Sequence, residues 1–191
     1  MVILASASPR RREILESLGV DIKIITADVD ESFNKPTPSD IAMQIAEKKC
    51  RAVYEKLDAE LSSLPVISAD TIVVIENEIM GKPKDEADAC RMLKKLSGSS
   101  HEVTTGICVG INGSFCCSYA TTKVFIDELT DAQIKTYIDS RDPFDKAGAY
   151  GIQGIFSKHV KKIDGCYFNV VGLPVNALAH LFLDATGKEL F

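Results

Sequence analysis

After Met1 the chain reads Val2-Ile3-Leu4-Ala5-Ser6-Ala7-Ser8-Pro9-Arg10-Arg11-Arg12, followed by Glu13-Ile14-Leu15-Glu16-Ser17-Leu18-Gly19. The apolar run at its start predicts a buried strand, and the residues after it predict a tight loop and then a helix. Ser8 suits the N-cap, Pro9 the first helical position and Gly19 the C-terminal stop. The chain is therefore expected to begin with a strand that feeds directly into a helix.

The charge of this predicted helix is unusual, because three arginines, Arg10 to Arg12, occupy its first turn. The helix dipole already places partial positive charge there, so cations are disfavoured. A bound anion would resolve the conflict, since free backbone N–H groups, the hydroxyls of Ser6 and Ser8 and the arginine side chains could hold a phosphate chain. The alternative is that the arginines are solvated on an exposed turn.

The bulk composition is that of an ordinary globular protein of 191 residues with a net charge of −5. This charge argues against broad nucleic-acid binding. No apolar run approaches the roughly 20 residues of a membrane helix, and no signal-like segment opens the chain, so we expect a cytoplasmic protein without a membrane partner. The six cysteines form no C-x-x-C pair and are expected to be reduced thiols.

Two acidic positions are candidates for chemistry. Asp70 interrupts the strand-forming runs Val66–Ala69 and Ile72–Ile75. A buried carboxylate is costly unless it is paired, hydrogen-bonded or bound to a metal, so Asp70 has either a functional or a structural role. Glu31 lies in a polar loop with two further carboxylates. That loop is either a solvated turn or a source of oxygen ligands for Mg²⁺.

Basic and polar residues in three further segments could face a ligand. Lys49 lies on a long predicted helix, and Lys82 lies in a Gly-Lys-Pro loop that lacks the Walker frame. The segment 142–154 is rich in Gly and Ala and carries Lys146 and Gln153. Small residues let a backbone approach a ligand closely, although an ordered loop without a ligand would fit the same composition.

Local signals in the second half of the chain predict turns and helix starts. Asn112-Gly113 between two strand-like runs predicts a hairpin, and Thr130 with Gln133 predicts a capping box. Val160–Ile163 and Cys166–Val171 are expected to form a second hairpin. Strands and helices intermix, which indicates an α/β or α+β mixed sheet rather than a regular doubly wound fold.

In the order and spacing of its motifs, the chain resembles the Maf family of nucleoside triphosphate pyrophosphatases over essentially its whole length. The matching blocks are residues 4–11, the helix carrying Lys49, residues 69–71, 81–83, 96–98, 145–154 and 170–174. The resemblance implies one domain over residues 1–191 with an α/β fold like that of inosine triphosphate pyrophosphatases. In that fold a mixed twisted sheet with flanking helices forms two lobes around a cleft. The family is often dimeric, so a homodimer is an implied partner.

The resemblance also implies an activity, which is cleavage between the α- and β-phosphates of a nucleoside triphosphate with a divalent cation, Mg²⁺ or Mn²⁺. The products are a nucleoside monophosphate and pyrophosphate, which limits the incorporation of modified nucleotides. One branch of the family acts on dTTP, UTP and related modified pyrimidine nucleotides. Arg10, Thr71 and Gln153 match that branch, whereas Ala7 stands where glycine or threonine is commoner.

The roles implied by this resemblance can be assigned residue by residue. Asp70 is the proton acceptor, with Glu31 as the second carboxylate for the metal. Lys82 and Lys49 add positive charge for the phosphates. The remaining substrate-binding residues are Ser6, Ser8, Arg10, Arg11, Thr71, Lys146 and Gln153. Of these, Thr71 and Gln153 are expected to read the pyrimidine edge. The alternative function is a nucleotide-binding regulator of cell division or septum formation with little turnover.

Overall fold

The structure is a computed structural model that describes residues 1–191. The chain divides into two compact units that interleave in sequence. Unit 1 comprises residues 1–70, 105–120 and 172–191, and unit 2 comprises residues 71–104 and 121–171. Three long strands pass from one unit into the other, so each unit is built from several separate segments of the chain.

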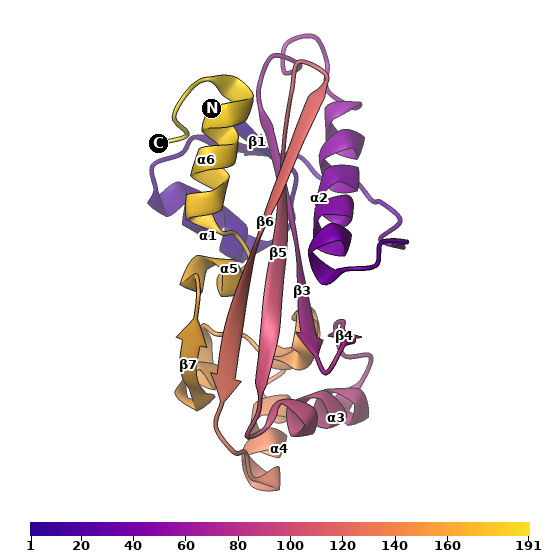
Figure 1. The fold of residues 1–191 in the computed structure, drawn as a ribbon, viewed down its shortest axis with the longest axis vertical. Helices are drawn as coiled ribbons and strands as arrows, with labels where there is room; N and C mark the ends of the chain where they lie inside the picture. Colours follow the sequence, from indigo (N-terminus) through magenta and orange to yellow (C-terminus); the bar gives the residue numbers. More distant parts are fainter. The chain divides into compact units, whose positions relative to one another are not determined.

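The strands form one mixed seven-stranded sheet, in the order β2-β1-β3-β5-β6-β7 with β4 paired to β3 (Figure 1). β1 runs parallel to both β2 and β3, whereas β4 is antiparallel to β3 and β7 is antiparallel to β6. This confirms the predicted mixed sheet with flanking helices. The strands are β1 (Val2–Leu4), β2 (Ile22–Ile24), β3 (Val66–Ile75), β4 (Glu78–Met80), β5 (Ser100–Ile111), β6 (Ser114–Ile126) and β7 (Val160–Asp164).

Unit 1 carries the helices α1 (Pro9–Ser17), α2 (Pro38–Tyr54) and α6 (Val175–Thr186). α2 packs very close to β5. A Cβ placed at Gly106 on β5 would lie only 2.3 Å from the main chain of Ala42 on α2. Only a glycine allows this approach. Ile3, Ala46, Cys50, Val66 and Cys108 belong to the core between these elements.

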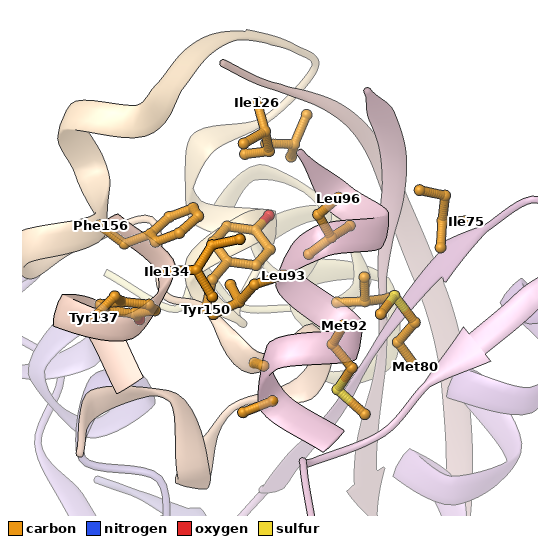
Figure 2. Close-up of a cluster of buried hydrophobic side chains, with 14 of the residues drawn as sticks. Ile75, Met80, Met92, Leu93, Leu96, Ile126, Ile134, Tyr137, Tyr150 and Phe156 are labelled. Atoms are coloured by element: carbon orange, nitrogen blue, oxygen red, sulfur yellow. The ribbon is translucent and has the colours of Figure 1, made fainter. Parts of the chain in front are cut away.

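Unit 2 carries the helices α3 (Glu86–Leu96), α4 (Asp131–Asp139) and α5 (Tyr167–Val171). It also contains three 3₁₀ turns, η1 (Asp142–Asp145), η2 (Ala147–Ala149) and η3 (Gly154–His159). Figure 2 shows its core, in which the aromatic rings of Tyr137, Tyr150 and Phe156 pack beside aliphatic side chains of α3. The Tyr150 and Phe156 ring centroids are 5.0 Å apart.

The local signals for turns and helix starts mostly hold. Thr130 and Gln133 form the predicted capping box at α4. The Asn112-Gly113 turn joins β5 to β6 with positive φ angles of 51° and 76°, as a tight hairpin of this kind requires. Gly19 ends α1 with φ of 76°. All six cysteines are free thiols. None of the helices could span a membrane.

The predicted hairpin over residues 160–171 is wrong in its second half. β7 pairs with β6, but residues 167–171 form the short helix α5. The buried side chain of Asn169 donates to the Val103 carbonyl oxygen at 2.8 Å and to Thr122 Oγ1 at 2.9 Å. These bonds satisfy an amide that would otherwise be costly to bury, so tertiary contacts outweigh the β-propensity of this segment.

Candidate active site

The loop between β1 and α1 is organised around the Ser6 hydroxyl. Ser6 is buried, and its Oγ accepts the backbone N–H of Ser8 at 3.3 Å and Nη1 of Arg11 at 3.1 Å. Ser8 occupies the N-cap position, as predicted, but its side chain makes no capping bond. The expectation that the Ser8 hydroxyl caps α1 is therefore wrong. The Ser6 hydroxyl, by contrast, is engaged within the loop.

Two of the three arginines of α1, Arg11 and Arg12, have different surroundings. Arg12 pairs with Glu16 one turn later at 2.7 Å, on the exposed side of the helix. Arg11 instead donates from Nε to the Gly172 carbonyl oxygen and from Nη1 to the Ala69 carbonyl oxygen, each at 2.8 Å. Burial lowers the pKa of Arg11 from its ordinary value, although Asp70 opposes that shift. Main-chain carbonyls therefore supply part of the negative potential that the arginine turn needs.

A charged cluster in unit 1 joins three predicted site residues. Nζ of Lys49, on α2, lies 2.7 Å from Oδ1 of Asp70, on β3, and 2.7 Å from Oε1 of Glu31. The Asp70 side chain is only 13% exposed and that of Lys49 20%, whereas Glu31 is 61% exposed. One ammonium thus bridges a largely buried carboxylate and an exposed one.

The electrostatics of Asp70 suit a group that takes up a proton. Burial raises the pKa of the Asp70 carboxyl, and the charges of Lys49 and Arg11 oppose the rise. Glu31 adds to it. A carboxylate with an elevated pKa is a better proton acceptor near neutral pH than a solvated one. The role of Asp70 as proton acceptor stays a prediction, because the pair with Lys49 also satisfies the structural alternative.

The carboxylates of Glu31 and Asp70 offer the oxygen ligands that a hard divalent cation needs. Asp30, also in the acidic loop, accepts the backbone N–H of Ser32 at 2.9 Å and so serves the turn. No group of three or more metal-ligating side chains occurs in the structure. Mg²⁺ often takes only one or two carboxylates and leaves its other positions to water and substrate phosphates. Glu31 and Asp70, which share one ammonium, fit that pattern.

In unit 2 the structure brings two of the predicted loops together. The backbone N–H of Gly148 donates to the Gly81 carbonyl oxygen at 3.0 Å, which joins the Gly-Lys-Pro loop to the segment 142–154. Lys82 and Gln153 are exposed, and Thr71 is half-buried on β3. The roles of these three side chains toward a substrate stay predictions.

Lys146 is more enclosed than the sequence suggests. Its side chain is 11% exposed, and its ammonium donates to Asp142 and Asp145. Asp142 also accepts the Tyr137 hydroxyl at 2.6 Å. No sequence motif marks Tyr137 or Asp142 as a functional residue. The only signal for them was their place in the chain, since Asp142 begins the Gly/Ala-rich segment 142–154 and Tyr137 lies shortly before it.

The chain is similar to known proteins over most of its length. The family model described as Maf-like protein matches residues 1–185. A dTTP/UTP pyrophosphatase from Caldicellulosiruptor bescii is 43% identical over 99% of this chain and 96% of its own length. One from Ruminiclostridium cellulolyticum is 46% identical over 94% of this chain and 93% of its own length.

Solved structures extend the comparison to the fold. The Ham1 protein of Staphylococcus aureus resembles the chain with a TM-score of 0.50 at 15% identity. The match covers 83% of this chain and 79% of the Ham1 chain. At this level of identity the likeness concerns the fold alone, and it agrees with the expected α/β architecture.

Proposed function

Because the chain belongs to the Maf family, we propose that it hydrolyses dTTP, UTP and related modified pyrimidine nucleotides to the nucleoside monophosphate and pyrophosphate. The observation that carries the proposal is the buried Asp70 carboxylate paired with Lys49, in a chain whose relatives are named dTTP/UTP pyrophosphatase. Those names do not favour the alternative, a nucleotide-binding regulator of cell division or septum formation with little turnover.

Asp70 is the proton acceptor in this proposal. Cleavage of a phosphoanhydride by water requires a base that takes a proton from the attacking water. The burial that raises the pKa of Asp70 makes its carboxylate more basic. Lys49, 2.7 Å away, keeps that carboxylate anionic before the proton arrives and holds its position.

The start of α1 holds the phosphates. The backbone N–H groups of its first turn and the Ser8 hydroxyl, which makes no capping bond, are donors for phosphate oxygens. Arg10 and Lys82 add positive charge. Ser6 and Arg11 bond to each other at 3.1 Å and shape this loop, in addition to any contact with the phosphates.

Glu31 and Asp70 hold the divalent cation, Mg²⁺ or Mn²⁺, together with oxygens of the substrate. When bound, such a cation neutralises phosphate charge and lowers the pKa of coordinated water. The contribution of this chain is two carboxylates held near each other by Lys49. Lys49 in turn offsets their mutual repulsion when no cation is bound.

Thr71 and Gln153 recognise the base. Amide and hydroxyl groups can pair with the polar edge of uracil or thymine, and a site built to make such bonds rejects bases that leave its groups unpaired. Lys146 contributes to this side of the site through the loop that carries Gln153.

The proposal is tested by incubating the purified chain with Mg²⁺ and each of the common ribo- and deoxyribonucleoside triphosphates, and measuring released pyrophosphate. We expect release from dTTP and UTP at rates well above those from purine nucleotides. Release of orthophosphate instead of pyrophosphate would place the cleaved bond elsewhere. Tight nucleotide binding without any release would refute the enzyme and favour the regulator.

A further inference from the structure

Three side chains of unit 2 form a connected polar network beside the segment that carries Gln153. The Tyr137 hydroxyl, on α4, lies 2.6 Å from Oδ2 of Asp142. Nζ of Lys146 lies 2.9 Å from the other oxygen, Oδ1, of the same carboxylate. Both oxygens of Asp142 are therefore engaged, one by a neutral donor and one by a cation.

The protonation of the Tyr137 hydroxyl decides which group donates in its hydrogen bond with Asp142. Burial raises the pKa of Tyr137 above its ordinary value, and the bond to Asp142 adds to the shift. The phenol therefore keeps its proton and donates it to the carboxylate, which can only accept. The phenolic oxygen remains able to accept, and the backbone N–H of Gly151 lies 3.3 Å from it.

Lys146 restrains Gly151 through van der Waals contact with its aliphatic chain, and not through its charge. Its ammonium donates to the Asp142 carbonyl oxygen at 2.6 Å, to Asp142 Oδ1 at 2.9 Å and to Asp145 Oδ1 at 2.7 Å. An ammonium has three donors, so these acceptors use all of them. Its aliphatic stem lies against Gly151, where an added Cβ would meet Cε at 2.7 Å and Cδ at 2.9 Å.

We propose that Tyr137, Asp142 and Lys146 are positioning residues that hold the main chain at Gly151 and thereby orient Gln153 for discrimination among pyrimidine bases. Gly151 is two residues before Gln153, so a fixed peptide there limits where the Gln153 amide can point. This inference rests on the proposed function, and it gives Lys146 a role that requires no direct contact with the substrate.

The test uses Tyr137→Phe, which removes only the hydroxyl and preserves the ring in the core. Tyr54→Phe is the matched control, because the Tyr54 hydroxyl also accepts a backbone N–H, that of Gly113 at 2.9 Å, in unit 1. For each protein, kcat and KM are measured with UTP, dTTP and CTP. We expect the ratio of kcat/KM for UTP to that for CTP to fall about fivefold in Tyr137→Phe. The ratio should be unchanged in Tyr54→Phe.

A second measurement examines the route through Gln153. If Tyr137 acts by orienting Gln153, adding Tyr137→Phe to a Gln153→Ala protein should not further change the ratio of kcat/KM for UTP to kcat/KM for CTP. Equal effects in the two backgrounds would overturn the inference. Asp142→Asn provides a second variant of the network, and it should lower the ratio in the same direction as Tyr137→Phe.

Hydrogen exchange gives a readout that does not depend on turnover. Amides of residues 147–154 should exchange faster in Tyr137→Phe than in the wild type, and at the wild-type rate in Tyr54→Phe. Unchanged exchange, or faster exchange with an unchanged UTP to CTP ratio in an active enzyme, would overturn the positioning role. A wild type that releases no pyrophosphate would instead refute the proposed function, so the two failures are distinguishable.

Discussion

The Asp70 carboxylate acquires its properties from its immediate neighbours, so its role can be tested by a substitution that preserves its shape. Asp70→Asn keeps the volume of the side chain but removes the basic oxygen beside Lys49. General-base catalysis contributes roughly 10²–10⁴-fold. We therefore expect kcat for dTTP to fall by about that factor, measured as pyrophosphate release. Binding of dTTP, measured by calorimetry, should change only a few-fold.

The control for this substitution is Asp184→Asn, an exposed carboxylate on α6. It should leave both kcat and nucleotide affinity at wild-type values. If Asp70→Asn retained most of the activity, Asp70 would not be the general base. A loss confined to affinity would assign Asp70 to substrate or metal binding alone.

Arg11 and Arg12 are adjacent in sequence, but their contributions to stability should differ widely. Arg11→Ala removes the hydrogen bonds that Arg11 donates to the buried Ser6 hydroxyl and to the carbonyls of Ala69 and Gly172. We expect it to lower the free energy of unfolding by about 3 kcal/mol. Arg12→Ala removes only an exposed pair with Glu16, which is worth about 0.5 kcal/mol.

Urea unfolding of the two arginine variants, without nucleotide, measures this difference. Equal losses in the two variants would mean that the carbonyl contacts of Arg11 contribute little. Addition of nucleotide should raise the melting temperature of the wild type more than that of Arg11→Ala, because the loop that Arg11 shapes belongs to the proposed phosphate site.

The Arg11 contacts also show what the sequence could not reveal about single residues. The clash between three arginines and the dipole of α1 is visible in the sequence and predicts a bound anion. Two of the acceptors of Arg11 lie 58 and 161 residues away in the chain. No local pattern identifies carbonyl oxygens at such separations as partners. Whether Arg11 also touches phosphate stays a prediction.

At the scale of helices and strands, prediction succeeded where the signal was local. The capping box of α4 and the Asn112-Gly113 hairpin both depend on residues no more than three apart. Prediction failed at α5, whose conformation depends on hydrogen bonds from Asn169 to distant residues. Val103 lies 66 residues away in the chain and Thr122 lies 47 residues away. Burial of one amide there outweighs a run of residues that favour strands.

The packing of α2 on β5 should be very sensitive to one methyl group. In Gly106→Ala the new Cβ would lie 2.3–2.4 Å from main-chain atoms of Ala42 and Met43, which cannot rotate away. We expect a loss of roughly 3 kcal/mol or more in the free energy of unfolding, measured with urea. Because α2 carries Lys49, displacement of the helix should also lower activity.

The control for this packing is Gly81→Ala, where an added Cβ meets nothing within 4 Å. It should keep the free energy of unfolding within about 0.5 kcal/mol of the wild type. A Gly106→Ala protein as stable as Gly81→Ala would mean that α2 can move away from β5 at little cost.

At the scale of the whole chain, the division into two units falls within β3, between two residues that the sequence predicts for the site. β3 places Asp70 at the end of one segment of unit 1 and Thr71 at the start of unit 2. The continuity of β3 was predictable, since runs of β-formers flank both residues. The division into two interleaved units was not, because it depends on contacts between distant segments. That residues 1–191 act as one catalytic domain, and as a homodimer, stays a proposal.

Global stability should fall in mild acid because of one histidine buried in unit 2. His101 is 2% exposed, its Nε2 lies 2.7 Å from the Tyr150 hydroxyl, and its Nδ1 has no partner. Burial lowers the pKa of His101 to about 4, whereas an unfolded histidine titrates near about 6.5. Between these values only the unfolded chain binds the proton, so stability falls as the pH drops from about 6.5 to about 4.

The His101 contribution amounts to about 3 kcal/mol, because its pKa is about 4 in the folded chain and about 6.5 in the unfolded chain, and a pKa difference of one is worth about 1.4 kcal/mol. Urea unfolding of the wild type and of His101→Asn at pH 7, 5.5 and 4 isolates it. His101→Asn should be less stable at pH 7, since it loses the bond to Tyr150, but its stability should fall by about 3 kcal/mol less on acidification. Carboxylates and the other two histidines affect both proteins alike, so they cancel in this difference. Parallel pH profiles for the two proteins would show that His101 is protonated as easily in the folded chain as in the unfolded one.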